Sequence, residues 1–211
     1  MSVCEALHGW ANSLPVFRFP FDVNQIPLNG IYILFEKGEI AHGTNRIVRI
    51  GTHTGSNQLP SRLRQHFLIE NKDRSIFRKN IGRALLNRDH DPFLPLWELD
   101  RTSRRMRDQH GGIDLDRQGA IENAVSDYMR NHFSFAVVRI DEKTERLGLE
   151  SKMISTVSLD DACQPSPQWL GLSSPKKKIR ESGLWVINEL YKEPLTFGDL
   201  ERLSSRPAPH P

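Results

Sequence analysis

The sequence has few of the residues that cross-link small secreted proteins or carry a chain through a membrane. Its 211 residues include only two cysteines, Cys4 and Cys163, which cannot form a disulfide framework or, unaided, a zinc site. No run approaches the ~18 consecutive apolar residues that span a bilayer. The first residues also lack the charged and apolar segments of a secretory signal. We therefore expect a cytoplasmic protein in a reducing compartment, with no membrane segment.

The residues that are present describe an ordinary globular chain with an uneven charge distribution. Hydrophobic residues make up 37% and charged residues 26%, and the net charge is +3. Residues 60–110 hold twelve Lys or Arg against seven acids, whereas residues 141–161 hold six acids against three bases. A basic segment beside an acidic one fits a polyanion-binding surface near a carboxylate-held cation, although solvated helix faces give the same pattern.

The hydrophobic pattern predicts one α/β domain with a small, mostly antiparallel sheet. Residues 30–35 and 46–50 are rich in β-formers and predict a hairpin with an enlarged connection, and a third strand is expected at 135–140. Residues 15–29 carry three prolines and are expected to be irregular. Apolar residues recur with helical spacing in six further segments, 1–14, 60–67, 75–86, 118–131, 143–156 and 179–191.

Side-chain alternation along the predicted hairpin brings two polar groups together. If the isoleucines of residues 30–35 are buried on one face, Tyr32 emerges on the other. On the partner strand, Val48 and Ile50 are expected to share the buried face, which leaves Arg49 beside Tyr32. A hydroxyl beside a cation suits phosphate chemistry, but an ordinary amphipathic hairpin has the same pattern.

The helix expected at 60–67 carries a second polar pair. Arg62 and His66 are four residues apart and share one helical face, which we expect to be exposed. A guanidinium and an imidazole on one face can hold and protonate phosphoryl oxygens. Arg64 points elsewhere and is expected to contact backbone phosphates or to be solvated.

Glu150 lies beside the apolar face of the helix expected at 143–156. A carboxylate in that position is costly unless it is paired or bound to a metal. One carboxylate with waters and a substrate phosphate is a common way to hold Mg²⁺. The alternative is a surface ion pair with Arg146, four residues earlier.

In this order, the residues resemble the GIY-YIG nuclease family, in its stand-alone, restriction-endonuclease-like branch. The resemblance covers roughly residues 28–157 and rests on Gly30-Ile31-Tyr32, Arg49-Ile50-Gly51, the helix from Arg62 to His66, and Glu150. It implies an α+β fold with a three-stranded antiparallel sheet flanked by helices, and with extra helices at both ends. The implied divisions are a lead-in at 1–27, a nuclease core at 28–157, a packed extension at 158–203 and a disordered tail at 204–211.

The resemblance also implies roles for the individual residues. Tyr32 would accept the proton of the nucleophilic water, Arg62 would stabilise the transition state, and His66 would lie near the nucleophile or the tyrosine. Glu150 would bind the single divalent metal, Mg²⁺ or Mn²⁺. Arg49 stands where the family has its second tyrosine, and it could contact the scissile phosphate or lower the pKa of Tyr32.

Two further departures from the family pattern concern spacing. Sixteen residues separate Tyr32 from Arg49, which is longer than is common in the family and fits the enlarged connection. The late asparagine of the family has no clear match, because residues 151–187 contain no asparagine and Asn188 lies far downstream. The last member of the family's site is therefore left without an assigned residue in this sequence.

Other polar residues are expected to contact nucleic acid. His53 follows the second motif and could line the cleft, and Arg78 and Lys79 place two cations at a helix start, where phosphates bind well. Together with Arg64, these residues make up the predicted nucleic-acid contacts. Loop solvation is an equal alternative for His53.

The sequence therefore predicts a metal-dependent endonuclease that hydrolyses DNA, with double-stranded DNA favoured. By analogy with the family, a nuclease of this size suggests restriction, defence or mobile-element biology. One alternative is a nucleic-acid-binding relative that has lost catalysis, and another is a partner-dependent subunit of a defence complex. A symmetric cutter of both strands needs two active sites, which would make a homodimer.

Overall fold

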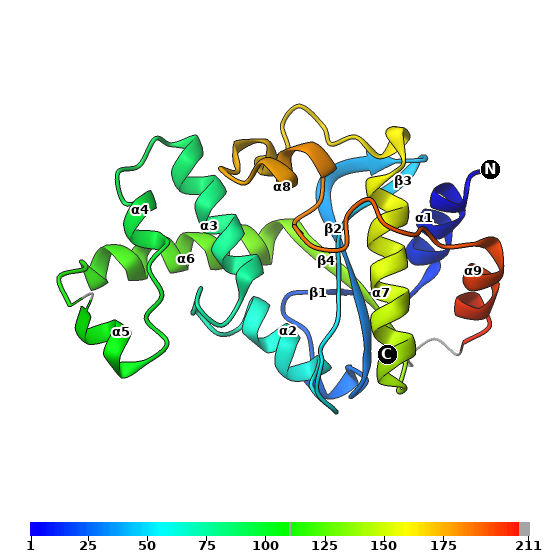
Figure 1. Ribbon diagram of the computed structural model, residues 1–211, viewed down its shortest axis with the longest axis horizontal. Coiled ribbons are helices and arrows are strands. Elements are labelled where there is room, and N and C mark those ends of the chain that lie inside the picture. The colour runs from blue at the N-terminus through cyan, green and yellow to red at the C-terminus, as the bar shows by residue number, and fades with distance from the viewer. Residues whose placement is uncertain (110, 207–211) are drawn as a thin grey trace.

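A four-stranded antiparallel sheet forms the centre of the computed structural model, which describes residues 1–109 and 111–206 (Figure 1). The hairpin strands are β2 (Gly30–Ala41) and β3 (Thr44–Gly51), and β4 (Phe133–Arg139) lies on the other side of β2. The fourth strand, β1 (Val16–Arg18), pairs with β4, so the strand order is β1-β4-β2-β3. The mixed α/β fold class is as predicted.

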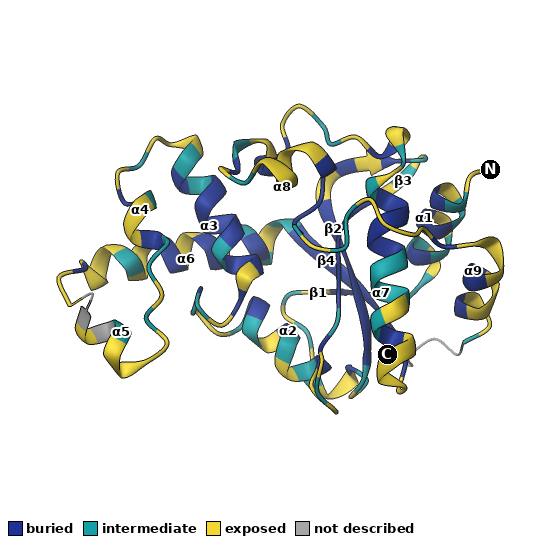
Figure 2. Ribbon diagram, viewed as in Figure 1, coloured by how far each residue is buried: buried dark blue, intermediate teal, exposed yellow. Residues whose placement is uncertain are grey.

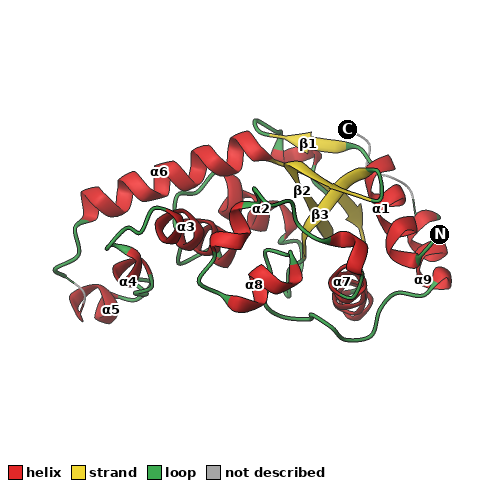
Figure 3. Cartoon of the chain, turned by 90° about the horizontal axis from the view of Figure 1, so that it is seen from above, coloured by secondary structure: helices red, strands yellow, loops and turns green. Residues whose placement is uncertain are grey.

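Helices cover both faces of this sheet. In the view from above, α3 and α6 lie on one side of the strands, and α1 and α9 lie on the other (Figure 3). One face packs against α2 (Leu59–Phe67), α3 (Ile76–Arg88) and α6 (Leu115–His132). The other face packs against α1 (Val3–Ser13), α7 (Lys143–Ser158) and α9 (Phe197–Ser204). Shorter helical segments connect them: η1 (Val23–Gln25), α4 (Leu94–Trp97), α5 (Arg104–Gln109), η2 (Asp161–Cys163), η3 (Leu170–Ser173) and α8 (Lys177–Ser182).

The two faces have different cores, and Figure 2 shows both as dark, buried bands along the strands and helices. The first, here called the aromatic face, buries Tyr32 and Leu34 among many aromatic side chains, including Phe67, Phe77 and Trp185. The second, here called the aliphatic face, buries mainly isoleucine, valine, leucine and alanine, including Ile31, Ile33, Ile47, Ile50 and Val138. The alternation along β2 therefore divides the two cores as the sequence indicates.

The hairpin differs from the predicted one in two ways. Its connection is a tight turn at His42 and Gly43, both with positive φ, because the strands continue to Ala41 and from Thr44. In addition, the pairing slips between Leu34 and Phe35. This bulge turns Val48 towards the aromatic face, whereas Ile50 remains on the aliphatic face.

Two elements depart from the sequence prediction. The predicted irregular segment contains β1, because its few residues between prolines find backbone partners on β4. The helix predicted at 179–191 ends with α8 at Ser182, where Gly183 adopts a left-handed conformation. Beyond it the chain continues through bends and turns beside β3, and the Trp185 N–H donates to the Val48 carbonyl at 2.8 Å.

A last helix lies close to the C-terminal end of the described chain. Thr196 and Asp199 form a capping box that starts α9, and the helix continues to Ser204. The rest of the predicted tail, residues 207–211, lies outside the described residues. In the part of the chain that the structure describes, no helix is long and apolar enough to span a bilayer.

Candidate active site

A chain of hydrogen bonds runs through the aromatic face at the open end of the β2–β3 hairpin, away from its turn. The Nε of Arg49 on β3 donates to the Tyr32 hydroxyl at 3.3 Å, and this hydroxyl lies 2.9 Å from Nε2 of His66 on α2. The other ring nitrogen, Nδ1, lies 2.7 Å from the hydroxyl of Ser75. Ser75 also caps α3, so the chain links two strands to two helices.

Charge and burial fix the direction of this chain. Burial, followed by the positive charges of Arg49, Arg62 and Arg78, lowers the pKa of His66 well below its usual value, so the ring is neutral. Because a guanidinium can only donate, the Tyr32 oxygen accepts from Arg49 and its own proton is free to bond His66 Nε2. The neutral ring then carries its proton on Nδ1, facing Ser75.

A glycine leaves the room that Tyr32 needs. A Cβ built on Gly51 would lie 2.2 Å from the Tyr32 hydroxyl, so any larger residue would displace it. Gly30, at the start of the same motif, is similarly constrained, because its Cβ would lie 2.2 Å from the Val138 carbonyl on β4. At both glycine positions of the sequence pattern, a larger side chain would therefore collide with a neighbouring residue.

Arg78 is bonded to His66 of the hydrogen-bond chain and does not face solvent. It is fully buried, and its guanidinium donates to Glu122 on α6 at 2.8 Å and to the backbone carbonyl of His66 at 3.1 Å. Lys79, also expected to bind nucleic acid, is largely buried and donates to the Glu98 carbonyl at 2.8 Å. Internal oxygens thus bind both charges in this structure, and the contacts of Arg78 and Lys79 with nucleic acid stay a prediction.

A cleft of about 520 Å³ opens beside this buried chain. We call it the main cleft, and its polar lining consists of Arg49, Arg62, Asn80, Glu150, Asn188 and Glu189. Arg49 is fixed in it by stacking 4.9 Å over the ring of Phe77 and by donating to the Trp185 carbonyl. The cleft thus combines two guanidinium groups with two carboxylates and two amides.

Glu150 reaches the main cleft from α7 and is largely buried. One of its oxygens accepts the Thr52 N–H at 2.9 Å. Burial raises the pKa of Glu150, and the nearby positive charge of Arg49 counteracts the rise. The alternative ion pair with Arg146 does not form, because that guanidinium is buried and donates to backbone carbonyls, including those of Ile140 and His53.

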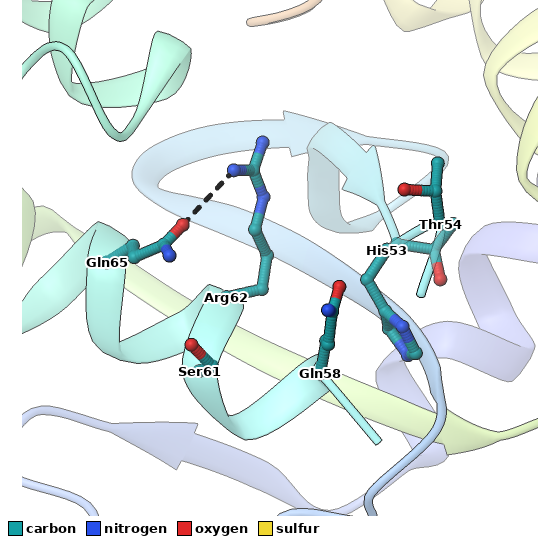
Figure 4. Close-up of a pocket in the computed structure, with 7 residues that line it drawn as sticks. His53, Thr54, Gln58, Ser61, Arg62 and Gln65 are labelled. Carbon is teal, nitrogen blue, oxygen red and sulfur yellow. Dashed lines mark hydrogen bonds between the residues drawn. The ribbon is translucent and has the colours of Figure 1, made fainter. Parts of the chain in front are cut away.

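Arg62 lies between the main cleft and a second hollow of about 350 Å³, which we call the side pocket (Figure 4). Figure 4 shows residues of α2 on one side of the side pocket, where Arg62 donates to Gln65 at 3.4 Å, and the loop after β3 on the other. His66 is buried beneath α2 instead of sharing an exposed face with Arg62, because its ring packs against Tyr32 and Phe77. Arg64 is exposed, as expected.

His53 lines the side pocket and is only 6% exposed. Its Nδ1 lies 2.8 Å from the Gly55 carbonyl, and burial lowers the pKa of the ring. Among the described residues, its buried Nε2 has no hydrogen-bond partner. His53 is therefore buried and held by the protein on one side, with an unpartnered acceptor on the other, which differs from a solvated loop residue.

A comparison with protein families identifies this arrangement. A family model described as a GIY-YIG domain matches residues 19–205. The chain belongs to the GIY-YIG family. Membership implies a nuclease, and hence a nucleic-acid substrate. Comparisons with curated proteins and with solved structures found no significant match.

The GIY-YIG match extends past the predicted core and includes the C-terminal residues that complete the main cleft. Asn188, which is remote in sequence from Glu150, lines the same cleft because the irregular segment after α8 passes beside β3, where Trp185 bonds to Val48. Asn80 and Glu189 were not expected there. The only sequence signal for Asn188 was the missing asparagine of the family pattern.

GIY-YIG nucleases typically use a divalent metal, and the main cleft has suitable donors for one. Glu150, Asn188 and Glu189 supply carboxylate and amide oxygens, which Mg²⁺ and Mn²⁺ prefer. A desolvated carboxylate such as Glu150 also gains more from a cation than a solvated one does. The residues present therefore fit a hard divalent ion.

Proposed function

We propose that the chain is a divalent-metal-dependent endonuclease that hydrolyses phosphodiester bonds of DNA in the main cleft. The observation that carries this proposal is the convergence of Arg49, Arg62 and Glu150 on one cleft, with the Tyr32–His66 chain directly behind Arg49. These residues come from β2, β3, α2 and α7, and a structural role alone does not require them to meet.

In this proposal the two arginines hold the phosphate. Arg49 is immobilised by Phe77 and the Trp185 carbonyl, so it provides a preorganised positive charge at one side of the main cleft. Arg62 lies at the opening shared with the side pocket, where it can follow the developing negative charge. Such preorganised donors commonly contribute 10²–10³ in rate, about 2.7–4 kcal/mol.

Tyr32 is the proposed general base: its phenol, which donates its own proton to His66 in this structure, would first release that proton to solvent, and the resulting phenolate would then accept a proton of the attacking water. Its oxygen is held by Arg49 on the cleft side and by His66 behind. His66 acts as a positioning residue, because an imidazolium among Arg49, Arg62 and Arg78 is unfavourable. This favours the direct route over a proton relay that ends on the histidine.

Glu150 would hold the metal ion, with Asn188 and Glu189 as further oxygen donors. When bound, the ion would neutralise the phosphate and stabilise the leaving oxygen. His53 and Arg64 remain proposed contacts to the nucleic acid. His53 offers its free Nε2 in the side pocket, and Arg64 offers a solvated cation on α2.

The test is plasmid nicking by the purified full chain in Mg²⁺, in Mn²⁺ and in EDTA. We expect metal-dependent cleavage that falls at least 10²-fold in Glu150→Gln. The amide keeps the size and shape of the side chain but loses the negative charge that would hold the metal ion. The matched control is Glu145→Gln on the same helix, because Glu145 is exposed and pairs with Arg206 outside the main cleft. Cleavage retained in Glu150→Gln would contradict the proposal.

One observation favours a second candidate, a relative that binds nucleic acid without cutting it. Arg49 replaces the second tyrosine of the family pattern and is used in contacts to Tyr32, Phe77 and Trp185. This candidate predicts DNA binding that survives EDTA and no cleavage with either metal. A cleavage-competent state that needs another protein would appear as activity in a lysate that the pure chain lacks.

A further inference from the structure

The two cysteines of the chain lie in contact, although 158 residues separate them in sequence. The sulfurs of Cys4 on α1 and Cys163 at the end of η2 are 3.3 Å apart, and both thiols are free and buried. Two histidines complete the group. His8 lies one turn after Cys4 on α1, and His42 lies at the tip of the β2–β3 hairpin.

The four side chains enclose one point. Their potential ligand atoms all lie within 4.8 Å of one another. Cys163 Sγ is 3.3 Å from Cys4 Sγ, 3.4 Å from His42 Nε2 and 3.8 Å from His8 Nε2. A tetrahedral zinc ion with bonds of about 2.0–2.3 Å separates its ligand atoms by about 3.3–3.8 Å.

We propose that Cys4, His8, His42 and Cys163 form a structural zinc site. Two thiolates and two imidazoles are the ligand set that zinc prefers in closed, four-coordinate sites. This set differs from that of the main cleft, whose oxygen donors suit Mg²⁺ or Mn²⁺. The cluster also lies against the aliphatic face, whereas the catalytic chain lies in the aromatic face.

The surroundings orient two of the ligands. His8 Nδ1 lies 2.9 Å from the Cys4 carbonyl, which holds the proton on that nitrogen and leaves Nε2 as the metal-binding atom. Nε2 accepts the Ile47 N–H at 3.2 Å, and coordination would replace that bond. The Cys163 sulfur lies within 4 Å of Cys4 Sγ, His8 Nε2 and His42 Nε2, so it faces the centre of the cluster.

His42 has an additional feature that fits a ligand. It has φ of 51°, in a two-residue hairpin turn where Asn or Asp followed by Gly is preferred. The turn directs its imidazole towards the cysteines, and a carboxylate oxygen of Asp160 lies 3.6 Å from the same Nε2. The additional negative charge favours a cation at this point.

A zinc ion here would join three segments that are distant in sequence. It would connect α1, the tip of the hairpin and η2, which directly follows α7, the helix that carries Glu150 (Figure 1). These segments meet at one edge of the aliphatic face. Metal binding to a preformed site adds its free energy to folding, so the ion would stabilise this edge.

The first measurement is the metal content of the full chain, purified with reductant and without chelator, by elemental mass spectrometry. We expect one zinc per chain, and after exchange with Co²⁺ the absorption of tetrahedral cobalt with thiolate ligands. Cys163→Ser should lose at least ten-fold in zinc affinity, since a hydroxyl is a poor zinc ligand. Glu150→Gln should keep its zinc, which separates this site from the proposed nuclease metal.

The matched pair of variants is His42→Asn and His90→Asn. Both histidines have φ of 51°, and asparagine tolerates this conformation, so neither change should strain the backbone. Only His42→Asn should lower zinc affinity and abolish the loss of thermal stability that a chelator causes in the unchanged chain. This pair tests the site even if Cys163→Ser fails to fold.

Three results would overturn the proposal. The first is a reduced, folded chain that binds no more zinc than Cys163→Ser does. The second is a Cys4–Cys163 disulfide recovered by mass spectrometry from protein purified without reductant, with no zinc in protein purified with it. The third is an equal effect of His42→Asn and His90→Asn on zinc affinity.

Discussion

The two faces of the sheet bury polar groups in opposite ways. On the aromatic face, Tyr32, His66 and Arg78 are fully buried and joined by hydrogen bonds deep among phenylalanine and tryptophan side chains. On the aliphatic face, the interior is filled by isoleucine, valine and leucine, with the Cys4–Cys163 cluster at one edge. The buried polar side chains of the covering helices, such as Arg146 and Asp199, bond to backbone carbonyls and to exposed side chains.

This difference shows on which face the fold buries polar and charged groups, which costs free energy. Buried charges and hydroxyls are expensive unless every one is paired, so a polar chain through a core indicates a requirement beyond stability. The aliphatic face needs no such chain, and its four metal-ligating side chains are confined to a position where they can connect segments. We therefore propose different roles for the two regions, one in chemistry and the other in stability.

The largest expected effect is the loss of stability when the Arg78–Glu122 ion pair beside the hydrogen-bond chain is broken. Glu122→Ala leaves the fully buried Arg78 guanidinium without its carboxylate, and we expect a loss of about 3–5 kcal/mol in the free energy of unfolding. Denaturant unfolding measures it. Asp127→Ala, at an exposed position on the same helix, should change stability by less than about 0.5 kcal/mol. Equal effects would show that the pair does not stabilise the aromatic face.

The second prediction concerns the rate of DNA cleavage in the main cleft. Arg62→Ala should lower the rate of DNA cleavage by about 10²–10³ with little change in stability, because Arg62 lines the cleft and is only half-buried. Single-turnover cleavage assays measure the rate. Arg64→Ala on the same helix should weaken DNA binding slightly and raise its apparent Kd without lowering the single-turnover rate at saturating protein. A matched loss of rate in both variants would argue for non-specific electrostatics.

The smallest effect is a gain in stability when the proposed metal carboxylate is neutralised. Burial raises the pKa of Glu150 in the folded chain, so the folded state binds this proton more tightly than the unfolded state does. Stability is therefore lost as the pH rises from the unfolded pKa through the folded one. Glu150→Gln should raise the Tm at pH 7 in EDTA, and this gain should disappear below the ordinary glutamate pKa of about 4.3.

Calorimetry at the two pH values tests this sign. Glu145→Gln should not raise the Tm, because Glu145 is exposed and paired with Arg206. A lower Tm for Glu150→Gln at pH 7 would mean that the carboxylate stabilises the fold without metal.

Local patterns in the sequence were sufficient for the hairpin and for most helices. Two-residue alternation places Tyr32 beside Arg49, and this follows from strand geometry alone. The burial of Arg78 could not be predicted in the same way, because a cation at a helix start looks the same whether phosphate or Glu122 is its partner. The short strand β1 likewise depends on backbone partners that only β4 provides.

The sequence by itself therefore determined the family, the hairpin with its tyrosine, and the helices with Arg62 and Glu150, because these depend on short-range spacing. Only the tertiary structure decided that His66 is buried, that Asn188 lines the main cleft and that Cys4 meets Cys163. In each of these cases the partner is contributed by a segment distant along the chain. Spacing within a segment carries no information about such contacts, which are fixed when helices and strands pack to bury their apolar faces.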